Sequence, residues 1–205
     1  MIPSRGRPRA RDAAQVGERI VEAAWAVLLE VGPEALTVDK VASAARASKQ
    51  TIYTRHEGKR ALLQAVLEAR VSAAVAGLES LPEARDARAA FVELLTRAVV
   101  MFSQPEKLMF DRVIDWIDAH AEPGEARPTR VALADRFCAM MEGHLATAQA
   151  RYGLSVEEPE MAARFWLDGV TGHMRCMAQG DGDQASWARA FTDFFLRGVG
   201  ARGGL

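Results

Sequence analysis

The chain has 205 residues, of which 49% are hydrophobic and 26% are charged, the composition of an ordinary globular protein. No apolar run approaches the roughly 18 residues that a membrane span needs, and the first residues, MIPSRGRPRARD, lack the apolar stretch of a secretory signal. These features predict a cytoplasmic protein without a membrane partner. The two cysteines, Cys138 and Cys176, are far apart and are expected to be reduced thiols, in no disulfide or metal site.

Charge is distributed unevenly along the chain, although the net charge is only −1. Residues 1–60 hold eleven Lys or Arg and seven Asp or Glu, whereas the rest holds 15 basic and 20 acidic residues. A basic N-terminal segment followed by an acidic remainder is expected where only the N-terminal segment binds a polyanion. An excess this small also arises by chance, so it supports other signals and predicts nothing alone.

Ala, Leu, Glu and Arg dominate the sequence and no β-branched run of period two occurs, so we expect an all-α fold. Glycine and proline divide the chain into about nine predicted helices, and Gly32-Pro33 is expected to stop the first. The glycine-rich residues 198–205 are expected to fray. The predicted helices span residues 16–31, 38–45, 49–55, 59–78, 82–102, 105–118, 128–152, 159–179 and 184–197.

Residues 37–56 contain two short predicted helices joined by a three-residue turn, which is the shape of a helix-turn-helix. Thr37 and Ser48 stand where a hydroxyl caps each helix. The second helix must be held across the first so that its N-terminal half can enter a major groove. Lysine can address guanine and glutamine can address adenine. We therefore predict that this half reads bases through Lys49, Gln50 and Thr51.

The segment TVDKVASAARASKQTIYTRHEGKRALLQAVL resembles the DNA-binding domain of the tetracycline-repressor (TetR) family. The family pattern is T-x-x-x-I-A-x-x-A-G-V-S-x-x-x-[LI]-Y-x-x-F-x-x-K-x-x-L, and the resemblance covers roughly residues 16–68. It implies a three-helix DNA-binding domain over residues 1–60, with a basic arm at 1–12, and a helical ligand-binding and dimerisation domain over residues 61–205. The matching residues are Thr37, Ala42, Ala45, Ser48, Ile52, Tyr53, Lys59 and Leu62.

Two residues depart from the family pattern. Arg46 stands where the family has glycine, so either Arg46 adopts a left-handed backbone or the turn differs. His56 stands where the family has a buried phenylalanine, so either its ring packs as a flat substitute or it adds a phosphate contact.

The resemblance also implies which residues contact the DNA backbone. Tyr53 and Lys59 would contact phosphates, and Thr37 and Ser48 would offer hydroxyls. Further backbone candidates are Arg46, Thr54 and His56. The arm residues, expected either to enter a minor groove or follow phosphates, or to form a solubilising tail, are Arg5, Arg7, Arg9 and Arg11.

The last two predicted helices carry broad apolar stripes. One short recognition helix reads few base pairs, and a homodimer presents two of them. The stripes are wider than one small core needs, so we predict a four-helix dimer interface, with burial inside the subunit as the alternative. The predicted interface residues are Met161, Phe165, Trp166, Gly169, His173, Trp187, Phe191, Phe194 and Phe195.

The resemblance implies a small-molecule effector, whose identity the sequence leaves open, in a pocket between the middle helices. Methionine-rich walls suit irregular, largely apolar ligands, although such stripes are more often plain core. The candidate pocket residues are Phe102, Met109, Trp116, Met141, His144 and Phe165.

No nucleotide-binding, metalloprotease or nucleophile-elbow motif occurs, so we expect neither an enzyme nor a cofactor. His144 and His173 have no ligand pair at a convincing spacing, so we expect no metal site. The predicted function is a sequence-specific DNA-binding transcriptional regulator, a repressor that releases its operator when an effector binds. The alternative is a helical interaction or scaffold protein without specific DNA binding.

Overall fold

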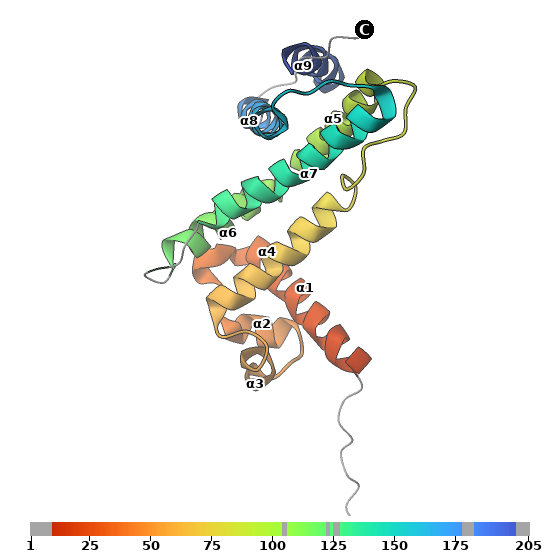
Figure 1. Cartoon of the computed structure of the whole chain (residues 1–205). Helices are drawn as coiled ribbons and strands as arrows, with labels where there is room; N and C mark the ends of the chain where they lie inside the picture. The colour runs from red at the N-terminus through yellow and green to blue at the C-terminus, as the bar shows by residue number, and fades with distance from the viewer. Residues whose placement is uncertain (1–9, 104–105, 122–123, 125–127, 178–182, 200–205) are drawn as a thin grey trace, which may run out of the picture. The chain divides into compact units, whose positions relative to one another are not determined.

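A computed structural model describes residues 10–103, 106–121, 124, 128–177 and 183–199 of the chain. Within these residues every regular element is a helix, which confirms the all-α prediction (Figure 1). None of the described helices is long and apolar enough to cross a bilayer. The helices are α1 (Ala10–Ala35), α2 (Val38–Ala44), α3 (Lys49–Tyr53), α4 (Lys59–Val75), α5 (Ala87–Phe102), α6 (Lys107–Ala119), α7 (Thr129–Tyr152), α8 (Pro159–Met177) and α9 (Gln184–Gly198).

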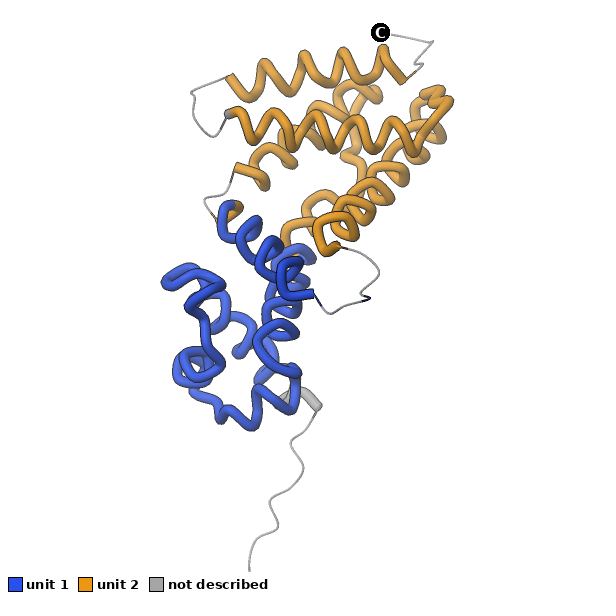
Figure 2. The backbone as a smooth tube through the Cα atoms, turned by 90° about the vertical axis from the view of Figure 1, so that its left-hand side faces the viewer, with its two compact units in different colours: residues 1–72, 108–125 blue, residues 73–107, 126–205 orange. Residues whose placement is uncertain are grey.

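The helices divide into two compact units (Figure 2). Unit 1 comprises residues 1–72 and 108–125, and unit 2 comprises residues 73–107 and 126–205. Unit 1 therefore contains nearly all of α6 in addition to α1, α2, α3 and most of α4. The predicted boundary after residue 60 falls inside α4, so the division into a DNA-binding and a ligand-binding domain stays a prediction about function.

Unit 1 is built on the apolar stripe of α1, where Ile20, Ala24 and Leu28 are fully buried. Helix α2 packs against α1, and α3 packs against α2; both helices bury the apolar side chains that their periodicity predicted. The ring of Trp25 also contacts Phe110 of α6, with centroids 5.3 Å apart. The buried residues from α2, α3 and α4 include Val38, Val41, Ala42, Ile52, Leu62, Leu63 and Val66.

Gly32 kinks α1 three residues before its end. Its φ of 77° and ψ of 170° are non-helical, and Pro33 follows within the same element. The predicted stop at Gly32-Pro33 is therefore confirmed as a kink, after which one further turn leads to Leu36. The guanidinium of Arg112 lies against Gly32 and forms an ion pair with Glu34 at 2.5 Å, so α6 is attached at the kink.

Unit 2 packs α7 mainly on α8 and α5 mainly on α9, and α5 also contacts α8. Helices α8 and α9 lie side by side in both views (Figures 1 and 2). Phe91 of α5 meets Phe195 of α9 edge to face, with centroids 6.0 Å apart. Arg88 donates two hydrogen bonds, of 2.6 and 3.0 Å, to the carboxylate of Asp193, and these lower the pKa of Asp193.

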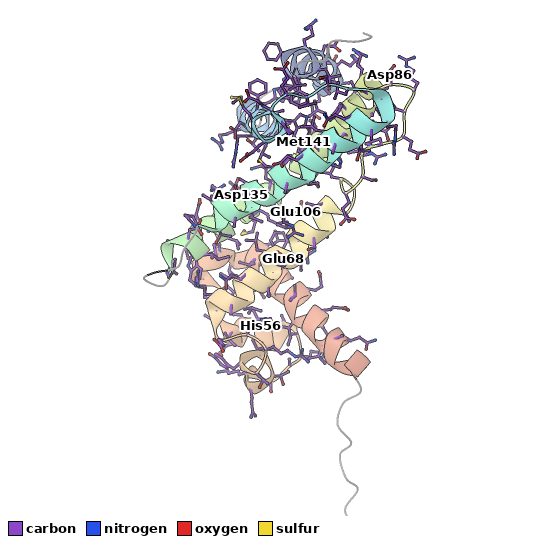
Figure 3. All side chains as sticks on the ribbon, viewed as in Figure 1. His56, Glu68, Asp86, Glu106, Asp135 and Met141 are labelled. Carbon is purple, nitrogen blue, oxygen red and sulfur yellow. The ribbon has the colours of Figure 1, made fainter. Side chains whose placement is uncertain are left out.

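The start of α5 differs from the prediction. Residues 82–86 are not helical, and α5 begins at Ala87 with Asp86 as its N-cap (Figure 3). Asp86 accepts a hydrogen bond of 2.7 Å from the Ala89 amide. Upstream, the Tyr152 hydroxyl donates to the Ala84 carbonyl and accepts from its amide, both at 3.1 Å. The backbone groups that a helix would use are thus taken by a side chain from α7.

We expect Gly32→Ala to destabilise the protein by about 1–3 kcal/mol, because the observed φ/ψ region is open only to glycine; the guanidinium of Arg112 would also have to move away from the new Cβ. Urea unfolding followed by circular dichroism measures this change. Gly77→Ala is the matched control, because a Cβ at Gly77 meets nothing within 4 Å. Equal effects of the two substitutions would contradict this account of the kink.

Candidate nucleic-acid interface

The two helices of the predicted helix-turn-helix are capped as the sequence indicates. The Thr37 hydroxyl accepts a hydrogen bond from the Lys40 amide at 3.3 Å, and the Ser48 hydroxyl accepts one from the Thr51 amide at 3.0 Å. Both hydroxyls thus satisfy amides that a helix start leaves without partners. Any contact between these hydroxyls and DNA stays a prediction.

A left-handed residue forms the corner between α2 and α3. Arg46 has a φ of 48°, the only positive φ at a non-glycine position among the described residues. The Ala47 amide donates to the Ala42 carbonyl at 3.0 Å, and the Arg46 amide donates to the Ser43 carbonyl at 3.2 Å. These two bonds make a Schellman motif, which favours glycine at the left-handed position. Arg46 thus adopts the left-handed backbone, the first of the two alternatives, and it is exposed to solvent.

The polar side chains of α3 gather on one side of the helix while Ile52 on the other side is fully buried. Gln50 is exposed, and the hydroxyl of Thr51 forms a hydrogen bond of 2.8 Å with that of Ser48. Thr54 is also exposed and donates to the Gln50 carbonyl at 2.7 Å. An open hollow brings these groups together with a residue that sequence reasoning missed, Arg55. It is lined by Ser48, Gln50, Thr51, Thr54 and Arg55.

Arg55 could have been found from spacing alone, because it follows Thr51 by four residues and so falls on the same helical face. The phenol of Tyr53 is 54% exposed, which leaves its hydroxyl accessible. Both side chains therefore extend the polar surface of α3 beyond its N-terminal half.

The structure favours one of the two interpretations of His56. The ring is half-buried, and its Nε2 is buried without a hydrogen-bond partner. Burial, with a smaller contribution from the charge of Arg55, lowers the pKa of His56. A neutral, packed ring matches the flat-substitute interpretation better than a phosphate contact does.

Lys59 is engaged inside unit 1. Its ammonium donates to the Glu34 carbonyl at 3.0 Å and lies 4.5 Å from the centre of the Trp116 ring. Trp116 is itself stacked on His120, and burial lowers the pKa of Lys59. The predicted phosphate contact of Lys59 would require the ammonium to leave these partners.

The predicted arm falls largely outside the described part of the chain. Arg5, Arg7 and Arg9 lie outside the described residues. Arg11 lies near the start of α1, whose bounds are Ala10–Ala35.

The predicted interface residues of α8 and α9 divide into exposed and buried sets. Met161, Phe165 and Phe194 are 65%, 48% and 58% exposed, whereas Trp166 and Phe195 are buried within the single chain. The rings of Phe165 and Phe194 lie 6.1 Å apart, which joins the exposed set across the two helices.

The other predicted interface residues, which are Gly169, His173, Trp187 and Phe191, join α8 to α9 within one subunit. His173 and Trp187 stack at 3.6 Å with their planes 3° apart, and Trp187 stacks in turn on Phe191. A Cβ on Gly169 would collide with the Phe191 ring. The close helix approach that Gly169 permits is therefore made inside unit 2.

The six candidate pocket residues are shared between the two units. Met109 and Trp116 belong to unit 1 with α6, whereas Phe102, Met141, His144 and Phe165 belong to unit 2. Met141 (Figure 3) is a buried residue of α7, whereas Phe165 is exposed. Phe102 packs against Phe137, with centroids 6.2 Å apart. No group of three His, Cys, Asp or Glu side chains in the described part of the chain could hold a metal ion.

Residues 20–66 match the family described as bacterial regulatory proteins, tetR family. A search of curated proteins finds none that matches this sequence.

Solved structures of similar fold span most of the chain. The flavonoid-responsive regulator FrrA is 21% identical, with 93% of this chain and 100% of FrrA covered and a TM-score of 0.71. A TetR-family regulator from Pectobacterium atrosepticum is 20% identical, with 93% and 97% covered and a TM-score of 0.64. The complex of SmeT with triclosan is 19% identical, with 90% and 91% covered and a TM-score of 0.63. SmeT is the repressor of the Stenotrophomonas maltophilia multidrug efflux pump SmeDEF.

The capped α2–α3 corner and the polar face of α3 define a helix-turn-helix DNA-binding regulator. Residues 20–66 match the tetR family of bacterial regulatory proteins, and the described helices have a fold similar to that of a solved TetR-family regulator.

His144 generates a prediction about pH. It is 3% exposed, its Nε2 has no hydrogen-bond partner, and burial lowers its pKa in the folded state. In the unfolded chain the histidine pKa is near 6.5. Below this pH, His144 therefore binds a proton more strongly in the unfolded chain than in the folded chain. We expect the free energy of unfolding to be constant above about pH 7.5 and to fall below about pH 6.5, by up to ~1.4 kcal/mol per pH unit for this group.

Urea unfolding between pH 5 and 8 measures the slope. His144→Gln should reduce it without abolishing it, because burial also lowers the pKa of His56 and His173. His120→Gln is the control, because His120 is exposed. An unchanged slope in His144→Gln would show that His144 is not the group responsible.

Proposed function

We propose that the chain acts as a homodimeric repressor that places one α3 helix of each subunit in successive major grooves of an operator. The observation that carries the proposal is the α2–α3 corner. Both caps and the Schellman turn fix α3 so that Ile52 is buried and the polar side chains of α3 are turned to solvent. Such a face has the donors and acceptors that base edges require. A protein that acts on the chromosome would work in the cytoplasm of a bacterium.

The dimer is supported by the exposed apolar patch of α8 and α9, defined by Met161, Phe165 and Phe194. Single exposed apolar side chains are ordinary, but a joined cluster on neighbouring helices marks an interaction surface. A two-fold axis at this patch would bring the two helices of each subunit together as a four-helix interface. Because α3 has only five residues, two copies are needed for selective binding.

An effector that enters unit 2 is supported by its apolar interior and by two proteins of similar fold. One is described as flavonoid-responsive, and the other is bound to triclosan. A largely apolar molecule suits an interior that contains Phe91, Met141 and Leu145. An effector that prefers a different spacing of the two α3 helices would lower operator affinity by population shift.

Binding to duplex DNA, measured by fluorescence anisotropy across a salt series, tests this function. We expect the logarithm of the affinity to fall linearly with the logarithm of salt concentration, because Lys and Arg release counterions from phosphates. The operator selected from a random duplex pool should contain two related half-sites. A chain that binds no duplex at low salt would instead be a helical scaffold.

Phe194→Glu tests the dimer. A carboxylate introduced into a buried apolar interface costs several kcal/mol unless it is paired, so we expect monomers in analytical ultracentrifugation and operator affinity reduced by about 100-fold or more. Leu108→Glu is the matched control, because Leu108 is also apolar and 71% exposed but lies in unit 1. A dimeric Phe194→Glu variant with full affinity would place the interface elsewhere.

A further inference from the structure

An ion pair links the first turns of α2 and α3. The Lys49 ammonium lies 2.7 Å from each carboxylate oxygen of Asp39. The two side chains are 59% and 65% exposed, so the pair stands in solvent beside the polar face of α3. Asp39 is thus brought next to a predicted base-reading residue by the packing of α2 across α3.

Stability does not account for this pair. Exposed ion pairs contribute little to folding, and a lysine in the first turn of a helix opposes the helix dipole. The pair has a different consequence at the DNA-facing surface, because it holds a donor and an acceptor at a fixed separation. Lysine has three N–H donors and a carboxylate has about four lone-pair sites, so both groups keep capacity for further hydrogen bonds.

That arrangement is complementary to the major-groove edge of a G·C base pair. Guanine presents the acceptors O6 and N7, and cytosine presents the N4 amino donor. Because O6 and N4 are hydrogen-bonded to each other, they are about 2.9 Å apart, close to the 2.7 Å between Lys49 and Asp39. The ammonium can donate to guanine while the carboxylate accepts from cytosine.

We propose that Asp39 is a specificity-determining residue, and that Asp39 and Lys49 together select one G·C pair in each half-site, with guanine at Lys49 and cytosine at Asp39. An A·T pair fits less well. With thymine at Lys49 and adenine at Asp39, the ammonium would meet one thymine oxygen instead of two guanine acceptors, and the thymine methyl group would lie beside it. This inference rests on the proposed DNA-binding function and adds a carboxylate that the family pattern does not mark.

Asp39 also has a cost for binding in general. Its carboxylate faces a polyanion and neutralises a cation that would otherwise approach phosphates. This electrostatic contribution weakens binding to every sequence, and the contact with cytosine offsets it at the matching G·C pair. The proposal therefore requires two opposite effects of Asp39→Ala: stronger binding to non-specific duplex and weaker discrimination at one base pair. A residue that only repels DNA would produce the first effect without the second.

The experiment begins with the operator selected by the wild-type chain from a random duplex pool. Affinities are then measured for that operator and for versions in which each half-site position carries the other three base pairs. We expect one position per half-site to prefer G·C by about 10- to 100-fold. Asp39→Ala and Lys49→Ala should each abolish most of that preference, and the double variant should lose no more than either alone.

Glu18→Ala is the matched control, because it removes an exposed carboxylate from α1 of the same unit. It should leave the preference unchanged. Asp39→Asn, which keeps an acceptor oxygen without the charge, should retain part of the preference and so separates base reading from simple repulsion. The proposal is overturned if Asp39→Ala preserves discrimination at every position, or if the position it affects prefers A·T. A wild-type chain that binds no duplex would refute the proposed function itself, which is a distinct result.

Discussion

The left-handed backbone of Arg46 is the constraint on which the DNA-binding surface depends. Without it, the carbonyls of Ala42 and Ser43 would lose the two amides that close the corner, and α3 could not lie across α2. A side chain at this position costs backbone energy that glycine avoids. In return, the turn between α2 and α3 carries an exposed guanidinium. The burial of Ile52 then fixes which face of α3 is turned outward.

Several cations of unit 1 are held by neighbouring groups. Lys40 donates to the Ala35 carbonyl, Lys49 to Asp39, and Lys59 to the Glu34 carbonyl beneath the Trp116 ring. Each of these contacts joins a helix start to the segment before it or to α6. The positive charge that DNA would meet is therefore placed by internal contacts, and contacts with DNA would have to compete with them.

In unit 2, neighbouring aromatic residues of one helix are divided between the interior and the surface. On α8, Trp166 is buried while its neighbour Phe165 is exposed; on α9, Phe195 is buried while Phe194 is exposed. Adjacent residues point about 100° apart on a helix, so one aromatic packs the subunit core and the next faces outward. The broad stripes on these helices therefore combine a core face with a second apolar face that is exposed in the single chain.

Local patterns in the sequence determined the all-α fold, the caps at Thr37 and Ser48, the break at Gly32 and the helix-turn-helix itself. Each of these depends on side chains within a few residues of one another, where propensity, capping and periodicity act. Contacts between distant segments were decided only by the tertiary structure: α6 packs with α1, Lys59 meets Trp116, Asp39 meets Lys49, and Tyr152 delays the start of α5. Helical periodicity predicts that a face is covered but not which distant residue covers it, because that choice depends on how the helices pack.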